Sequence, residues 1–354
     1  MKRKYDFEKS FRICFLAAVI VFTMIACIGC SREPASESSA EQSSACIENT
    51  ETASEEPTDA KKELFVFRPI VDSPFYEQAY SKEHMQSFRN MMNALLNYET
   101  EFDIADGVEW WQVDEFASYL FPAYSKLVQE VTQTDSKGTI TYQNDREITK
   151  KLLRSFAEKV EWWINSCTES DEPDMVKALK IYLKISEEIS YDYEAADDNS
   201  FIDVSPYRAI MDKEGICQSF APAYAYLLMQ IGIDACPVGG LTEDLTMAHE
   251  WTMLKLSDRW FYADVTFENG NEDNTLWYFG MTAQRRYEEG NFTIDSMNIG
   301  ECNRIWGKDI DVSDERFAGL RDIYNVTDIT YDNDYVIVEG TDFNNMPVSV
   351  QISY

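Results

Sequence analysis

Histidine is scarce in this chain of 354 residues, which contains only His84 and His249. A metal site built from several histidines is therefore excluded, and a histidine acting as a general base must be one of these two. Positive charge is also scarce, since 31 Lys and Arg stand against 63 Asp and Glu, for a net charge of −32. This balance argues against a nucleic-acid partner, whose phosphates need cationic side chains, and against docking on an anionic membrane surface through protein charge.

Closely spaced cysteine pairs are absent after the first thirty residues. The cysteines beyond that point are odd in number and irregularly spaced: Cys46, Cys167, Cys217, Cys236 and Cys302. This pattern argues against a zinc ribbon and a dense disulfide framework, and leaves open one or two bridges or a free, functional thiol. For Cys236 and Cys302 a buried thiol or a structural bridge is favoured over a catalytic role. Apolar residues are plentiful, with 45% hydrophobic and 14% aromatic content, so the chain can build a sizeable core.

The first thirty residues have the pattern of a secretory signal. Five basic residues up to Arg12 precede the apolar run Ile13–Ile28, which is short for a membrane span of about 20 residues. The run ends in Gly29-Cys30, which resembles the lipobox of bacterial lipoproteins, where the cysteine is diacylated and becomes the new N-terminus. We predict a signal peptide at 1–29 and a lipid anchor at Cys30 in the bacterial cell membrane, with lipidation of Cys27 or an uncleaved anchor as alternatives. Both readings place the rest of the chain outside the cytoplasmic membrane.

Four further regions follow the signal. Residues 30–63 are rich in Ser, Glu and Ala and are predicted to form a disordered acidic tether, because they can bury too little apolar surface to fold. Residues 64–169 are predicted as a helical N-terminal domain, since apolar side chains recur there at intervals of three and four. A catalytic domain is predicted at 170–300. Alternating valines predict short strands in 301–354, a C-terminal β extension folded as a small meander.

A cysteine stands at the predicted start of a helix in the catalytic domain. The helix follows Gly215 and ends at Gly232, and Pro222 must lie near its first turn because a deeper proline would break a backbone hydrogen bond. Cys217 therefore lies where free N–H groups and the positive end of the helix dipole favour a thiolate. Its own backbone N–H is also available to a developing oxyanion.

Two predicted strands of a hairpin carry a histidine and an aspartate. Residues 248–256 and 260–266 flank Ser257-Asp258. If these two residues form the whole loop, His249 faces Thr266 and Asp264 faces Trp251, so that His249 and Asp264 share one face as diagonal neighbours. A three-residue loop would put them on opposite faces. A thiolate needs a base, and the base needs a carboxylate to hold its tautomer; Cys217, His249 and Asp264 supply these groups in that order.

At this point the chain resembles the transglutaminase-like superfamily over about residues 174 to 285. The resemblance rests on ordered motifs around the cysteine, the histidine and the aspartate, with flanking positions before and after them: Gly215-x-Cys217-x-x-Phe220-Ala221, His249-x-Trp251, Trp260-x-x-x-Asp264-x-Thr266, Tyr191-Asp192 and Tyr278-Phe279. Many members have proline where this chain has Val265.

The resemblance implies an α+β, papain-like fold. It also implies Cys217 as nucleophile, His249 as general base and acid, and Asp264 as orienting carboxylate. A second oxyanion donor is not evident from the motifs; Tyr191 is a weak candidate and Gln218 a weaker one. The triad needs no cofactor. Glu268, Glu272 and Asp273 after the hairpin are predicted to lie in a solvated loop rather than to bind a cation.

The chemistry implied is acyl transfer through a thioester. We expect hydrolysis of peptide or amide bonds in protein or cell-wall peptide, because bacterial members of this kind are mostly expected to hydrolyse. A cross-linking transglutaminase, which transfers the acyl group to a lysine amine, is an alternative that the triad does not exclude. The rival class is a non-catalytic, peptide-binding adaptor lipoprotein built on the same fold.

Overall fold

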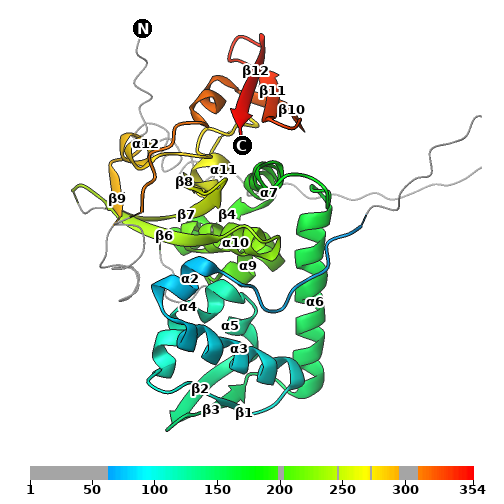
Figure 1. The fold of residues 1–354 in the computed structure, drawn as a ribbon, viewed down its shortest axis with the longest axis vertical. Helices are drawn as coiled ribbons and strands as arrows, with labels where there is room; N and C mark the ends of the chain where they lie inside the picture. Colours follow the sequence, from blue (N-terminus) through cyan, green and yellow to red (C-terminus); the bar gives the residue numbers. More distant parts are fainter. Residues whose placement is uncertain (1–62, 198–202, 245–246, 272, 295–309) are drawn as a thin grey trace, which may run out of the picture. The chain divides into compact units, whose positions relative to one another are not determined.

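The fold of the chain is drawn in Figure 1 from a computed structural model, which describes residues 63–197, 203–244, 247–271, 273–294 and 310–354. The predicted signal peptide, Cys30 and Cys27, the tether up to residue 62, and Cys302 lie outside these described residues. No helix within the described ranges is long and apolar enough to cross a membrane.

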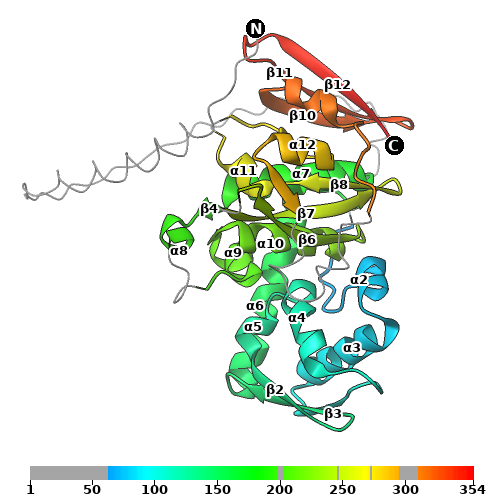
Figure 2. The same cartoon turned by 90° about the vertical axis from the view of Figure 1, so that its left-hand side faces the viewer.

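A four-stranded antiparallel sheet forms the framework of the region around the predicted triad. Its strands have the order β8 (Arg259–Ala263), β7 (Ala248–Leu256), β6 (Ala235–Thr242) and β9 (Phe292–Ile294). Both views show helices α10 and α9 on one face of this sheet and helices α11 and α12 on the other (Figures 1 and 2). These helices are Cys217–Gln230, Pro206–Asp212, Val265–Asn269 and Ala283–Glu288, respectively. The predicted α+β class is confirmed.

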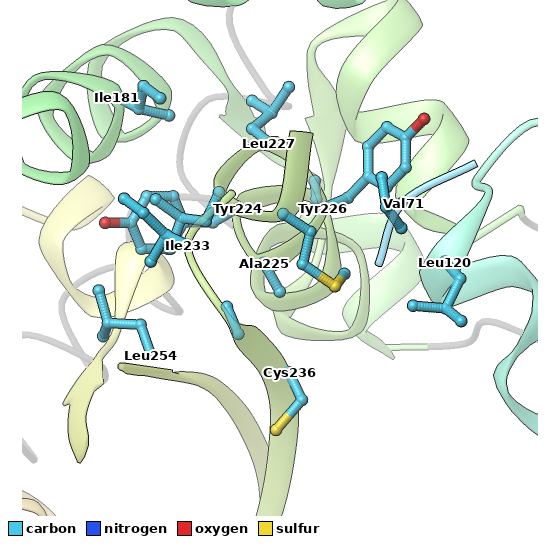
Figure 3. Packing of buried hydrophobic residues seen from close by; sticks show 14 of the residues in the cluster. Val71, Leu120, Ile181, Tyr224, Ala225, Tyr226, Leu227, Ile233, Cys236 and Leu254 are labelled. Atoms are coloured by element: carbon cyan, nitrogen blue, oxygen red, sulfur yellow. The ribbon is translucent and has the colours of Figure 1, made fainter. Parts of the chain in front are cut away.

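Helix α10 is the centre of the hydrophobic core. Every residue from Ser219 to Gln230 is buried, so the helix is covered on all sides, and most of these side chains are apolar. Tyr224 and Tyr226 point to opposite sides of it (Figure 3). Tyr224 donates a hydrogen bond to Ala178 of α7 (Asp174–Glu188), whereas the Tyr226 ring packs on Phe156 of α6 (Arg146–Asn165). Packing on all sides therefore fixes the position of the helix start, which carries Cys217.

The hairpin has the two-residue turn that the predicted register requires. Ser257 and Asp258 both have positive φ, 47° and 62°, as in the type I′ turns that join right-twisted strands. Thr252 pairs with Ala263, in agreement with the predicted pairing. The second strand ends earlier than predicted, at Ala263, because the Asp264 side chain accepts a hydrogen bond from the Phe267 backbone N–H and caps helix α11.

The region 64–169 is mainly helical, with a small sheet that the sequence did not predict. Its helices are α2 (Pro74–Ala79), α3 (Lys82–Asn97), α4 (Trp110–Leu120), α5 (Tyr124–Leu127) and α6. The sheet has the order β1 (Glu101–Asp103), β3 (Lys137–Tyr142) and β2 (Val128–Thr134). The turn predicted near Asp135 joins β2 to β3, so its flanks are strands instead of helices.

Short elements connect α7 to the start of α10. Strand β4 (Ser190–Tyr191) pairs in parallel with β5 (Glu214–Gly215), and helix α8 (Tyr193–Asp197) follows β4. At the C-terminal end, β10 (Asn325–Tyr331), β11 (Tyr335–Thr341) and β12 (Pro347–Ser353) form the predicted antiparallel meander after the 3-10 helix η3 (Ala318–Asp322).

Gly240 gives a test of the packing beside the predicted histidine. It pairs with His249, and a Cβ there would meet the backbone oxygen of Thr293 and the Trp251 ring at under 3.0 Å. We expect Gly240→Ala to lower the free energy of unfolding by about 1–3 kcal/mol, the usual cost of overpacking, in urea titrations. Gly270→Ala is the matched control, because its Cβ would meet nothing closer than 3.4 Å. Equal effects of the two substitutions would contradict this packing.

Candidate active site

Cys217 is the first residue of α10, as predicted. Strand β5 ends at Gly215, two residues before Cys217. A glycine is required at position 215 because a Cβ there would collide with the Ser219 side chain. The Ser219 hydroxyl accepts from the Ile216 N–H at 3.3 Å and donates to the Val204 carbonyl at 2.7 Å. These bonds fix the entry into the helix, and the Cys217 thiol is free and partly exposed.

The structure brings Cys217, His249 and Asp264 together around one imidazole. His249 Nε2 lies 2.7 Å from Asp264 Oδ2, and the Cys217 side chain is close enough to the ring to act on its charge. His249 and Asp264 are both buried, with exposed fractions of 8% and 0%, whereas the thiol is reached from outside. The arrangement thus has a partly exposed thiol, with a buried imidazole and a buried carboxylate behind it.

A buried arginine belongs to the same cluster and was missed by the sequence analysis. Arg286 of α12 is 1% exposed, and its Nη1 forms an ion pair with Asp264 Oδ2, the oxygen that also contacts His249. Its Nη2 donates to the Glu289 carbonyl at 2.9 Å. Position 286 lies 22 residues beyond the aspartate motif, on a short helix. The one available signal was an arginine in an otherwise acidic chain, which is too weak to identify it.

The positive and negative groups around Asp264 stabilise each other's charged forms. Burial lowers the pKa of His249, but Asp264 and Cys217 outweigh it and raise that pKa to about 9. Burial raises the pKa of Asp264, but His249, Arg286 and the Phe267 N–H hold it below its ordinary value. The Asp264 carboxylate is therefore ionised, and the His249 imidazole retains its proton at neutral pH.

Aromatic rings enclose the imidazole. The His249 ring centroid lies 4.6 Å from that of Phe267 and 5.2 Å from that of Phe292, and Trp251 stacks at 6.1 Å. Such apolar walls limit water at the base and restrict the orientation of the ring.

The two oxyanion candidates lie near the thiol. Tyr191 of β4 pairs with Gly215, and its phenol is close enough to Cys217 for the two groups to interact electrostatically. Burial, chiefly, raises the pKa of Tyr191, so its hydroxyl keeps its proton and is available as a donor. Gln218 follows Cys217 in the first turn of α10 and is exposed. The neighbouring Asp192 forms an ion pair with Arg208 at 2.6 Å and so has a structural partner.

The prediction that Glu268 lies in a solvated loop is wrong. Glu268 is buried, and its carboxylate accepts hydrogen bonds from the Tyr182 hydroxyl, the Asn271 amide and the Tyr278 N–H, as well as from Thr275. It lies in α11, whose start is fixed by Asp264, so the chain turns inwards directly after the hairpin. Glu272 lies outside the described residues, and among the described ones no cluster of three or more His, Cys, Asp or Glu could hold a metal ion.

The other described thiols have structural surroundings. Cys236 is fully buried on β6, in agreement with the buried thiol that was favoured, and burial raises its pKa. Cys167 is half-buried, and burial, chiefly, raises its pKa to about 12. Both thiols are therefore protonated at neutral pH.

Comparison with known proteins agrees with the motif analysis. Residues 162–265 match the model of the transglutaminase-like superfamily, a segment that contains Cys217, His249 and Asp264 but not Tyr278-Phe279 or Arg286. The predicted resemblance is confirmed for that segment. No curated protein matches the chain.

Two solved structures are similar at low identity. A crystal structure of a TGase is 15% identical, covering 40% of this chain and 46% of its own, with a TM-score of 0.29. A protein from Cytophaga hutchinsonii described as a "putative cysteine protease" is 17% identical, covering 38% of this chain and 55% of its own, with a TM-score of 0.24. The chain spans about half the length of these two proteins.

Glu250, next to the candidate base, gives a pH-dependent prediction. Period two places it on the opposite face of β7 from His249, near Tyr119 of α4, where it is 5% exposed and one carboxyl oxygen has no partner among the described residues. Burial, chiefly, raises its pKa to about 8. Because the folded protein holds this proton longer than the unfolded chain, Glu250 contributes stability below about pH 4.3 that is lost as the pH rises through about 8.

We therefore expect Glu250→Gln to flatten the fall in stability between pH 5 and pH 8, by at most about 1.4 kcal/mol per pH unit. Urea unfolding at several pH values measures this difference, with the exposed Glu130→Gln as the matched control. Parallel pH curves for wild type and Glu250→Gln would show that the buried carboxyl is ionised throughout.

Proposed function

We propose that this protein is an acyl-transfer enzyme of the transglutaminase-like kind that hydrolyses peptide or amide bonds through a thioester on Cys217. The observation that carries the proposal is that one imidazole, His249, contacts the Asp264 carboxylate and lies close enough to the Cys217 thiol to interact with it electrostatically. Nucleophilic cysteine catalysis requires this set of groups.

The reaction follows from the contacts. The Cys217 thiolate attacks the carbonyl carbon of the substrate, and the backbone N–H groups at the start of α10 would donate to the negative oxygen as it develops. The His249 imidazolium gives its proton to the leaving amine, the C–N bond breaks, and a thioester remains. Water then attacks the thioester while His249 takes a proton from it, and release of the carboxylic acid restores the thiol and imidazole, which re-form the ion pair by proton transfer.

The second nucleophile is the point on which hydrolysis and cross-linking differ. Incubation of the full chain with casein, with and without biotinylated cadaverine, separates them by mass spectrometry. New chain ends or conversion of glutamine to glutamate would support hydrolysis. Amine incorporation would identify a transglutaminase, and no product, together with an unreactive Cys217, would favour the adaptor.

We further propose that the chain is held at the outer side of the bacterial membrane by lipid on Cys30. The proposal rests on the N-terminal sequence alone, in which Gly29-Cys30 ends an apolar run. Expression in a bacterium followed by detergent phase partition tests it. Cys30→Ala is expected to shift the protein to the aqueous phase or leave an uncleaved precursor, whereas the same result for Cys27→Ala alone would move the anchor to Cys27.

A further inference from the structure

The side chain of Arg286 is held by charge, by a backbone carbonyl and by three rings. Besides the Asp264 carboxylate and the Glu289 carbonyl, its guanidinium lies over the rings of Phe267 at 4.5 Å, Phe292 at 5.1 Å and Trp251 at 5.5 Å. The same three rings surround His249. Arg286 and His249 are thus packed into one aromatic enclosure with Asp264 between them.

Both cationic groups use the same carboxylate oxygen. Asp264 Oδ2 contacts His249 Nε2 and Arg286 Nη1, while Oδ1 accepts from the Phe267 N–H at 3.0 Å. Three donors therefore fix the plane of the carboxylate. The guanidinium also offsets the charge that the carboxylate presents to the imidazole, because opposite charges at short range neutralise each other's field.

We propose that Arg286 is a positioning residue of the acyl-transfer site: it orients Asp264 toward His249 and weakens the pull of that carboxylate on the imidazole proton. The role in acyl transfer rests on the proposed function, whereas the electrostatic coupling of Arg286 to His249 can be measured without it. Arg286 lies outside residues 162–265, the segment matched by the superfamily model, so the match to that model does not assign it a role.

Four groups around His249 influence the protonation of its imidazole. Asp264 and Cys217 favour the imidazolium, the carboxyl of the adjacent Glu250 is also close enough to interact with it, and Arg286 opposes it through Asp264. Loss of the guanidinium charge should leave the full carboxylate charge to His249, which would then hold its proton to a higher pH.

His249 titration can be observed directly because the chain contains two histidines only. The full chain, purified in a mild detergent with 13C-labelled histidine, is titrated by NMR in a Cys217→Ala background, which removes the contribution of the thiol. His84→Gln assigns the two signals. Arg286→Met and Arg286→Lys are compared with the parent.

We expect the His249 midpoint to rise by about 1 pH unit or more in Arg286→Met and to stay within about 0.3 of the parent in Arg286→Lys, which keeps the charge. In the Cys217 enzyme, Arg286→Lys is expected to lower kcat for p-nitrophenyl acetate hydrolysis, because lysine lacks the second contact to Glu289. An unchanged midpoint in a folded Arg286→Met protein would overturn the proposal and leave Arg286 with a structural role.

The Lys variant decides the matter if the Met variant does not fold. A retained midpoint with reduced kcat supports the positioning role, and a raised midpoint or an unchanged kcat contradicts it. If the wild type hydrolyses neither the ester nor any peptide, the proposed function fails, while the titration still reports whether Arg286 and His249 are coupled.

Discussion

Replacing Cys217 with alanine is expected to reduce acyl transfer to the uncatalysed rate. In the proposed mechanism the thiol forms the covalent intermediate, and no other described thiol acts on His249. His249→Ala retains the nucleophile but loses the base and acid, so its kcat/KM should fall by about 10²–10⁴-fold. Both values are measured on the same ester or peptide, with folding checked by circular dichroism.

Cys167→Ala is the matched control for loss of a thiol, since Cys167 is half-buried and lies outside the cluster around His249. It should retain wild-type kcat/KM. At neutral pH iodoacetamide should modify Cys217 faster than Cys167 or Cys236, and His249→Ala should slow the reaction at Cys217. Activity that survives Cys217→Ala would show that the reaction does not pass through this thioester.

Local sequence signals predicted the parts of the site that lie on regular elements. Gly215 placed Cys217 at a helix start, and a two-residue turn fixed the face of the strand that carries His249. These features depend on backbone preferences of residues adjacent in sequence, which a single chain records directly. The prediction that Pro222 lies near the first turn is wrong, because Pro222 is the sixth residue of α10 and lies inside the helix.

The missed parts depend on contacts between distant residues. Arg286 meets Asp264 only because α12 packs on the sheet, and nothing in its neighbourhood distinguishes it from a surface arginine. Glu268 is in an acidic stretch that would normally be solvated, yet the cap made by Asp264 turns it inwards against Tyr182. The small sheet of β1, β3 and β2 was also missed because it depends on a distant contact: β1 pairs with β3 across about 35 residues.

The largest loss of stability is expected from Asp264→Ala. The substitution leaves the guanidinium of Arg286 buried without its anion, takes one partner from His249, and removes the cap of α11. Breaking a buried ion pair by removal of one partner costs about 3–5 kcal/mol. Urea unfolding at pH 7 should show a loss of this size, together with loss of acyl transfer.

The dependence of that loss on pH has a definite sign. The pKa of Asp264 is lowered in the folded protein, so the stability it contributes is present above its ordinary value of about 3.9 and is lost as the pH falls through the folded value. The difference between wild type and Asp264→Ala should therefore shrink in acid.

A double variant separates loss of the pair from loss of packing. In Asp264→Ala/Arg286→Met the uncompensated guanidinium is gone, and methionine can fill part of the space between the rings of Phe267 and Phe292. We expect the double variant to be more stable than the sum of the two single effects by about 1–3 kcal/mol, because the two residues are in direct contact. Additive effects would mean that Asp264 stabilises the fold through its helix cap and His249 alone, and that Arg286 is held by its rings and by the Glu289 carbonyl.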